Sequence, residues 1–276
     1  MKFRSVAEFE AYLNGGTLNE AFAKYSKERS HDAESKKFFG TKDWNEADEL
    51  LKYGDRKSYE MIKQSGRSVE ARGKARRNEL FTAICGVTPN VPAYLAGSPA
   101  AMINTRKKTV KNKVLKIYYN CAASCDKKTQ QMAKAAAAVL QTVCDVEATG
   151  TRVELNIVTH VTQETKKHNF GQHLISCVCV KRAEERLDPL KIAYPTVNPS
   201  FLRRHNLRFI EVTKGVNEDF VFGYGYPVQD PNETKAMIKD TNAVFLSCES
   251  IIKWGDMYKK DPTEFIAEEI HDQLNG

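Results

Sequence analysis

The sequence has no long apolar run. No apolar segment approaches the ~18–20 residues that a membrane span needs, so we expect no membrane partner. The opening residues, MKFRSVAEFEAYL, carry acidic side chains where a signal peptide would be apolar, which argues against secretion. The seven cysteines are odd in number and scattered, and Cys177 and Cys179 lie inside a strand-like apolar run, a pattern that suits reduced thiols. The composition therefore predicts a soluble cytoplasmic protein.

Sequence motifs for several kinds of chemistry are also missing. The six histidines show neither the C-x-x-C nor the H-x-x-x-H spacing of a zinc site. The segment FGYGYP at Phe222 lacks the GK[ST] of a phosphate loop and the strand–helix context of a dinucleotide site. Cys121 and Cys125 flank a loop, but no motif assigns them a histidine base. We therefore predict that the protein is not an enzyme and binds no cofactor.

The N-terminal region, residues 1–104, reads as mainly helical and charged. Ser5 and Glu8 have the spacing of a capping box, and Asp43 and Gly54 bracket a second helix. We predict a third helix over residues 57–80, interrupted near residues 65–66. The segment CGVTPNVPAYLAGSP that follows is rich in turn formers and is expected to be a structured connector.

From residue 105 onward the pattern predicts an α/β domain that extends to residue 276. Apolar, β-branched runs predict strands, and longer segments with one apolar face predict helices. The expected strands are residues 113–119, 151–161, 173–182 and 242–250, and the expected helices are residues 126–147 and 261–274. A short helix from residue 198 should lead into another extended piece. Alternating strands and helices predict a parallel or mixed sheet flanked by helices.

This order of elements resembles the von Willebrand factor A fold. In that family the first strand ends in Asp-x-Ser-x-Ser, whose oxygens hold a divalent cation together with a Thr and an Asp from later loops. The matching positions are Asn120, Ala122 and Ser124, and the late strand ends in Ser247 and Cys248 where the family has its Asp. A hard cation needs several oxygens, at least one from a carboxylate. The resemblance thus implies the fold with a degenerate metal site, and we predict no bound metal.

A closer resemblance is to a family encoded by tailed bacteriophages that carries no assigned activity. Four segments carry it, which are WNEADELL from Trp44, VPAYLAGSPAAM from Val91, RVEL from Arg152 and FLRRHNLRF from Phe201. The similarity covers about residues 43 to 210. It implies a setting, the cytoplasm of the infected bacterial host, and supplies no chemistry.

Positive charge is the remaining feature. The run TRKKTVKNKVLK holds six cations without one acid, and GRSVEARGKARRNE lies upstream. Aromatic residues are interleaved at Tyr94, Tyr118, Tyr119, Phe201 and Phe209. Cations that follow phosphates and rings that stack on bases are what a single-stranded nucleic acid requires, although most such runs are solvated faces. The predicted contacts are Arg72, Arg76, Arg77, Arg106, Lys107, Lys108, Lys111, Lys113, Arg203 and Arg204.

Three functional hypotheses follow. The first is a non-enzymatic phage protein that binds nucleic acid, preferably single-stranded DNA, to support phage transcription or replication, with a phage or host polymerase as a partner it recruits. The second is a protein–protein adaptor or virion component that uses the A-like domain. The third is a working metal-dependent adhesion site, which a cation titration would reveal.

Overall fold

We analysed a computed structural model of the chain. It describes residues 1–19, 22, 38–65, 78–107, 114–124, 126–165, 168–216 and 224–275. The described strands are β1 (Lys2–Phe3), β2 (Asn78–Ala83), β3 (Thr88–Pro89), β4 (Met102–Lys107), β5 (Val114–Asn120), β6 (Arg152–Thr165), β7 (His168–Lys181), β8 (Tyr226–Pro227) and β9 (Ala243–Ser247). The described helices are α1 (Val6–Gly15), α4 (Trp44–Tyr53), α5 (Arg56–Ser65), α6 (Val91–Leu95), α7 (Thr129–Ala148), α8 (Pro189–Val197), η1 (Phe201–Asn206), α9 (Leu207–Val212), α10 (Pro231–Ile238), α11 (Cys248–Tyr258) and α12 (Pro262–Asn275).

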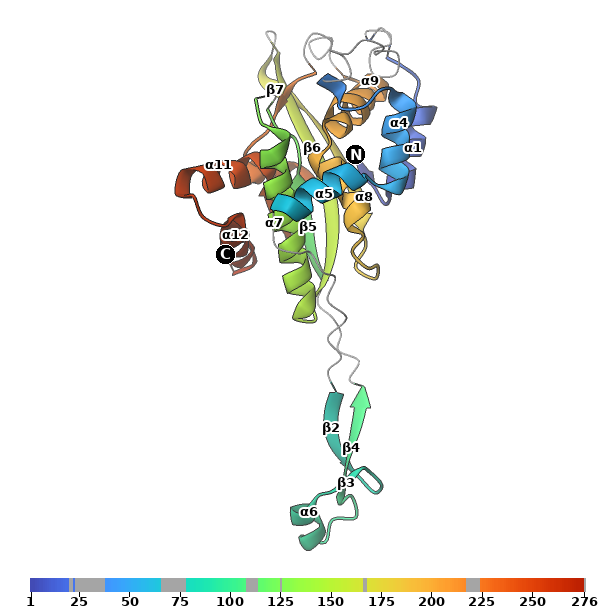
Figure 1. Ribbon diagram of the computed structural model, residues 1–276, viewed down its shortest axis with the longest axis vertical. Coiled ribbons are helices and arrows are strands. Elements are labelled where there is room, and N and C mark those ends of the chain that lie inside the picture. The colour runs from blue at the N-terminus through green and yellow to red at the C-terminus, as the bar shows by residue number, and fades with distance from the viewer. Residues whose placement is uncertain are drawn as a thin grey trace.

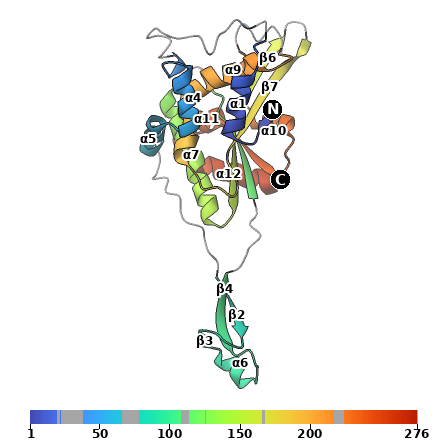
Figure 2. The same ribbon diagram turned by 90° about the vertical axis from the view of Figure 1, so that its right-hand side faces the viewer.

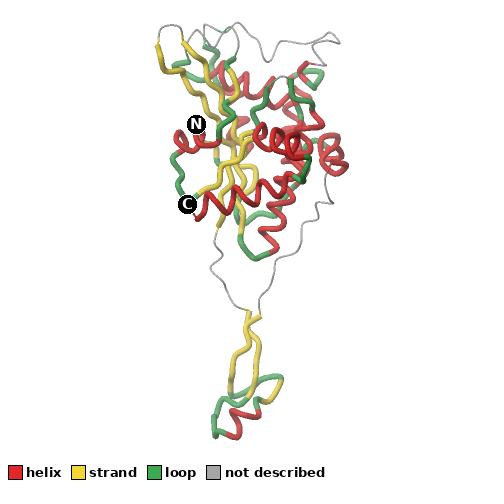
Figure 3. The backbone as a smooth tube through the Cα atoms, turned by 90° about the vertical axis from the view of Figure 1, so that its left-hand side faces the viewer, coloured by secondary structure: helices red, strands yellow, loops and turns green. Residues whose placement is uncertain are grey.

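The larger of two sheets has six strands, in the order β1-β7-β6-β5-β9 with β8 pairing to β6. β5 runs parallel to both of its neighbours, β6 and β9, whereas β6 and β7 form a long antiparallel hairpin. Helices flank this sheet (Figures 1 and 3), and Figure 3 shows its strands running side by side through the larger part of the molecule. The predicted mixed α/β architecture is confirmed.

The sheet is buried on both faces because apolar side chains alternate along its strands. In β5, Ile117 and Tyr119 belong to the larger apolar cluster and Tyr118 to a smaller one on the opposite face. The smaller cluster includes Phe245 of β9 and Ile238 at the end of α10. A parallel strand pair with both faces covered accounts for the unbroken apolar run that the sequence shows here.

Helix α7 covers one face of the sheet, as predicted. Met132, Ala136, Val139, Leu140 and Val143 are all buried. The alanines between residues 135 and 138 are buried as well, because small side chains let the helix approach its neighbours closely. No helix within the described ranges combines the length and apolarity that crossing a membrane requires.

The N-terminal helices belong to the same unit as the α/β domain, which differs from the predicted division at residue 104. β1 pairs in parallel with β7 at one edge of the six-stranded sheet. Helix α5 packs against α7 and α8, and α4 against α8. The predicted caps are present, because the Ser5 and Asp43 side chains accept hydrogen bonds from the amides of Glu8 and Glu46. We call residues 1–65 and 114–275, as far as they are described, the main unit.

The second unit, which we call the arm, spans Asn78–Lys107. It is a three-stranded antiparallel sheet in the order β2-β4-β3, with the short helix α6 near its tip. Figures 1 and 2 show it drawn apart from the main unit. The helix predicted over residues 57–80 is therefore wrong at its end, because α5 stops at Ser65 and residues 78–80 are strand. The segment NELFTA contains the β-forming side chains Phe and Thr and no helical stripe.

The segment after Asn198 is also helical for longer than predicted. The π-helix η1 continues directly into α9, which ends at Val212, so the extended piece expected here is absent from residues 198–212. Phe201, Phe209 and Ile210 are buried along this segment. Burial extends around most of this segment and includes the polar side chains of Arg204, His205 and Asn206, so tertiary packing favours helix here without a one-sided apolar pattern in the sequence.

Candidate nucleic-acid interface and the loop after β5

Almost all of the excess positive charge flanks the arm. Residues 66–113 contain ten Lys and Arg against two Glu, whereas the whole chain has 42 Lys and Arg against 35 Asp and Glu. The net charge of this segment is therefore +8 against +7 for the entire protein, which leaves the rest of the chain at −1. Within the segment the cations fall at residues 67–77 and 106–113, which we call the two basic runs. A concentration of one sign of charge creates a positive potential that attracts anions.

The pairing of β2 with β4 brings the chain positions where the two basic runs join the arm to the same end of it. Asn78 lies opposite Lys107 in the antiparallel register. Arg77 is bonded to Asn78, and Lys108 to Lys107, so one run enters the arm where the other leaves it. Among the predicted contacts, Arg106 and Lys107 are the last two residues of β4. The structure describes the backbone of these two residues but not their side chains. Arg72, Arg76, Arg77, Lys108, Lys111 and Lys113 lie outside the described residues.

The remaining two predicted contacts lie on η1 in the main unit. The Arg203 guanidinium donates to the carbonyl of Phe38 and stands 4.3 Å from the centre of that ring. Arg204 is fully buried; its Nε lies 2.9 Å from Thr41 Oγ1 and its guanidinium covers the Phe39 ring at 4.5 Å. Arg204 thus holds residues 39–41 against η1 and has no surface for a phosphate, so it leaves the proposed interface.

The aromatic side chains that the sequence interleaves with the cations are mostly interior. Tyr118, Tyr119, Phe201 and Phe209 are buried in the main unit, whereas Tyr94 is 72% exposed near the tip of the arm. Only Tyr94 among these five rings is therefore placed to stack on a base. Alternation along β5 put both tyrosines inside because both faces of the sheet are covered.

The loop after β5 lies where the strand order reverses. Asn120 ends β5 beside Val158 of β6 and Ser247 of β9, at the carboxyl edge where open α/β sheets bind ligands. The Asn120 amide nitrogen donates to the Val228 carbonyl at 2.8 Å. Its Oδ1 accepts from the Ala122 and His160 amides at 3.1 and 3.3 Å. This buried side chain therefore ties three segments together.

Ser124, at the end of the same loop, bonds to a carboxylate that the sequence pattern did not indicate. Glu249 Oε1 accepts from the Ser124 amide at 2.5 Å and from the Ser124 hydroxyl. Glu249 follows β9 by two residues, in the first turn of α11, and is buried. The positions that match the family's metal-binding Asp are Ser247 and Cys248, so the resemblance did not point to Glu249. The sequence signal that could have found it is an acidic residue in the first turn of a helix that follows a buried strand.

These residues do not fit the metal site of the resembled fold. Asn120 uses its oxygen on two backbone amides, Ala122 offers none, and Ser124 is bonded to Glu249. Ca²⁺ needs about six to eight oxygen ligands and Mg²⁺ about six, part of them from water. Among the described residues, no group of three or more His, Cys, Asp and Glu side chains is arranged to bind a metal ion.

The thiols around this loop are protonated at neutral pH. Burial raises the pKa of Cys121 well above its usual value, with the neighbouring Cys248 as a second cause. Burial likewise raises the pKa of Cys248 to about 11. A thiol is a poor nucleophile compared with its thiolate, so these cysteines pack as small apolar side chains.

A histidine pair lies behind the loop, between β6 and β7. His160 Nε2 is 3.0 Å from His173 Nδ1, and His160 Nδ1 is 2.9 Å from the Thr234 hydroxyl. Burial, and then His173, lower the pKa of His160 to about 4. His160 is therefore neutral at pH 7; its bond to Thr234 fixes α10 to the sheet, and its bond to His173 joins β6 to β7.

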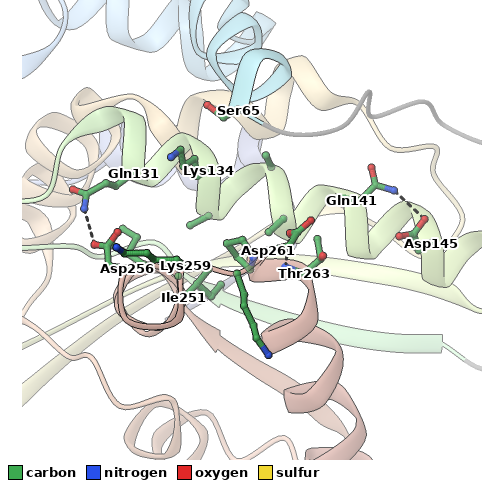
Figure 4. A pocket seen from close by; sticks show the side chains of 17 residues that line it. Ser65, Gln131, Lys134, Gln141, Asp145, Ile251, Asp256, Lys259, Asp261 and Thr263 are labelled. Atoms are coloured by element: carbon green, nitrogen blue, oxygen red, sulfur yellow. Dashed lines mark hydrogen bonds between the residues drawn. The ribbon is translucent and has the colours of Figure 1, made fainter.

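A pocket of about 810 Å³ opens between α7, α11 and the start of α12. Figure 4 shows Gln131 pointing to Asp256 and Gln141 to Asp145, with amide–carboxylate distances of 2.9 Å in both pairs. Alanines of α7 and two isoleucines of α11 line it together with three acids and three lysines: Asp145, Asp256, Asp261, Lys134, Lys259 and Lys260. Balanced charges and paired amides favour no class of ligand.

Comparison with known proteins identifies the family. Residues 1–272 match the family model described as a domain of unknown function, DUF7192, so the chain belongs to that family. No curated protein and no solved structure matches it.

Proposed function

For this member of the DUF7192 family we propose nucleic-acid binding, with single-stranded DNA as the preferred ligand. The observation that carries the proposal is the concentration of the net positive charge in the two basic runs beside the arm. The paired ends of β2 and β4 bring the runs together, so that one stretch of nucleic acid can meet both. Neutralising phosphates releases counterions, and this supplies affinity without sequence preference.

The preference for single strands and the biological setting are finer parts of the proposal. Exposed Tyr94 supports stacking on an unpaired base. The resemblance to a phage family supports a role in phage transcription or replication in the host cytoplasm, with a recruited polymerase as one partner. A protein–protein adaptor is the second candidate, which the uncovered apolar side chains of the arm favour.

The test measures fluorescence anisotropy with labelled single-stranded and duplex DNA of one length, at several salt concentrations, with and without EDTA. The test variant reverses Arg76, Arg77, Lys107 and Lys108 to Glu. The control variant reverses Lys57, Lys63, Arg186 and Lys253, four exposed cations of the main unit, to Glu, so both variants change the net charge equally.

We expect the test variant to lose about 100-fold in affinity or more at low salt, and the control about 3-fold or less. Losing four phosphate contacts lowers the slope of log affinity against log salt by about 3 for a single strand. Equal losses in both variants would assign binding to overall charge and not to the basic runs. If the wild type binds neither DNA at low salt, the proposal is wrong, and if EDTA abolishes binding, the loop after β5 holds a metal.

A further inference from the structure

The arm between Leu80 and Thr105 has no core of its own. None of the described side chains in this stretch is buried, and Ile84 and Val87 are 82% and 84% exposed. Leu80, Tyr94 and Leu95 are more than two-thirds exposed as well. Small sheets need one apolar face covered to be stable, so this surface is incomplete in a single copy.

The same stretch has no ionisable charge. Residues 80–105 contain no Asp, Glu, Lys or Arg, although these residues make up 28% of the chain. A polyanion needs cations along its path, so this stretch adds no phosphate contact to those proposed at the base of the arm, and Tyr94 is its one proposed contact with a base. Loss of charge at the centre of a patch, with aliphatic and aromatic side chains retained, is instead typical of protein–protein interfaces.

The long edge of the arm is unprotected compared with the edge of the main sheet. At the main sheet, the Gln273 side chain bonds both the amide and the carbonyl of Phe245 in edge strand β9, at 2.8 and 3.0 Å. In the arm, β2 pairs with β4 alone among the described strands. From Leu80 to Ala83 it carries no lysine or proline of the kind that usually blocks an edge, whereas the opposite edge, β3, contains Pro89.

From these features we infer that the arm is a self-association surface, in which β2 of one copy pairs antiparallel with β2 of a second copy. A two-fold axis then presents the same edge from both sides, uncharged from Leu80 to Ala83, and two three-stranded sheets become one of six strands. Leu80 and Thr82, which share one face of β2, gain cross-strand neighbours from the partner copy.

Antiparallel pairing also keeps the basic ends apart. The two copies place their Asn78 ends at opposite ends of the shared ladder, about 20 Å apart for a strand of six residues. This exceeds the Debye length of about 8 Å at physiological salt, so the charges that adjoin the arm repel each other little. Parallel pairing would bring both basic ends together. The dimer would then present two nucleic-acid-binding ends, but its formation does not depend on nucleic acid.

The test measures the mass of the full chain by sedimentation and light scattering, from about 1 to about 100 µM protein, without DNA. The test variant is Thr82→Lys, which puts a charge on the open edge. The control is Thr105→Lys, which puts the same charge on the same face but on the central strand β4, opposite Leu80 and away from the open edge of β2. Both threonines are exposed, so neither substitution disturbs a core.

The expected result is a wild-type dimer whose dissociation constant rises about 10-fold or more in Thr82→Lys and about 3-fold or less in Thr105→Lys. A wild type that stays monomeric over the whole range overturns the inference and leaves the arm to a different protein or to DNA. Equal effects of the two lysines, or masses that grow beyond a dimer, also overturn it. Circular dichroism of each variant checks that the main unit is folded.

Discussion

The main unit buries large side chains throughout, whereas the described part of the arm between Leu80 and Thr105 buries none. In the main unit, Phe9 is fully buried between Phe3, Phe201 and Phe209, with ring centres 5.1 to 6.4 Å apart. In the arm, the comparably large Tyr94 is 72% exposed. The stability of the protein therefore resides in the main unit, and the arm is available for contacts with other molecules.

Polar groups follow the same division. Lys181 is buried and its ammonium group lies 2.6 Å from Glu147 and 2.7 Å from the Val153 carbonyl, so its charge is satisfied inside the fold. Arg204 and Asn120 are likewise bonded within the main unit. A cation or amide in this unit serves packing, because a buried polar group without a partner is costly. None of the described contacts gives the cations of the two basic runs a role in packing.

The largest effect should come from truncating one aromatic ring in each unit. Phe9→Ala removes a fully buried ring, and we expect a loss of about 3–5 kcal/mol in the free energy of unfolding. Tyr94→Ala removes an exposed ring and should change it by about 0.5 kcal/mol or less. Urea denaturation at pH 7 measures both. A comparable loss in Tyr94→Ala would show that the arm is packed after all.

Acid should weaken the main unit through its buried histidines. The pKa of His160 falls from 6.5 to about 4, and burial lowers that of His205 to about 3. At pH values between the lowered pKa of each histidine and 6.5, the unfolded chain binds a proton that the folded chain does not. Stability is therefore lost as pH falls below about 6.5. Each histidine should contribute about 2 kcal/mol of this loss between pH 7 and pH 5.

The matched variants for this prediction are His160→Gln and His271→Gln. His160→Gln removes one titrating group, so its stability should fall less between pH 7 and pH 5 than that of the wild type. His271 is exposed on α12, and His271→Gln is the matched control for loss of a histidine. Urea denaturation at both pH values gives the slopes. Identical slopes in all three proteins would mean that His160 is accessible to protons in the folded state.

The sequence predicted the main unit well because long periodic segments determine it. The one-sided apolar pattern of residues 129–148, the caps at Ser5 and Asp43 and the alternation in β5 all appear in the structure. It missed β1, because a strand of two residues has no period and is defined only by its pairing with β7. It misplaced the arm, because the prolines and glycines after Cys85 were interpreted as a connector.

The candidate sites were harder to predict, since exposure and partners are set by the fold. Arg204 resembles the other cations in the sequence, yet η1 turns it into the interior against Thr41. Glu249 gave no motif, because its bond to Ser124 joins residues 125 positions apart. The basic runs were visible from composition alone, but the pairing of Asn78 with Lys107, which brings their ends together, required the structure.

The smallest effect should follow from removing the arm. Replacing residues 78–107 by Gly-Ser removes only partly or fully exposed side chains between Leu80 and Thr105, as far as they are described. The replacement also shortens the connection between α5 and β5 to less than half of its length. Each halving of a loop stabilises the fold by about 0.6 kcal/mol, which corresponds to a rise of about 2 °C in Tm. Tm should be measured by circular dichroism at low protein concentration, because association through the arm would stabilise the full chain and not the shortened one. A decrease of about 2 kcal/mol or more at that concentration would mean that the arm contributes to the folding of a single copy, and the contrast between the two units would fail.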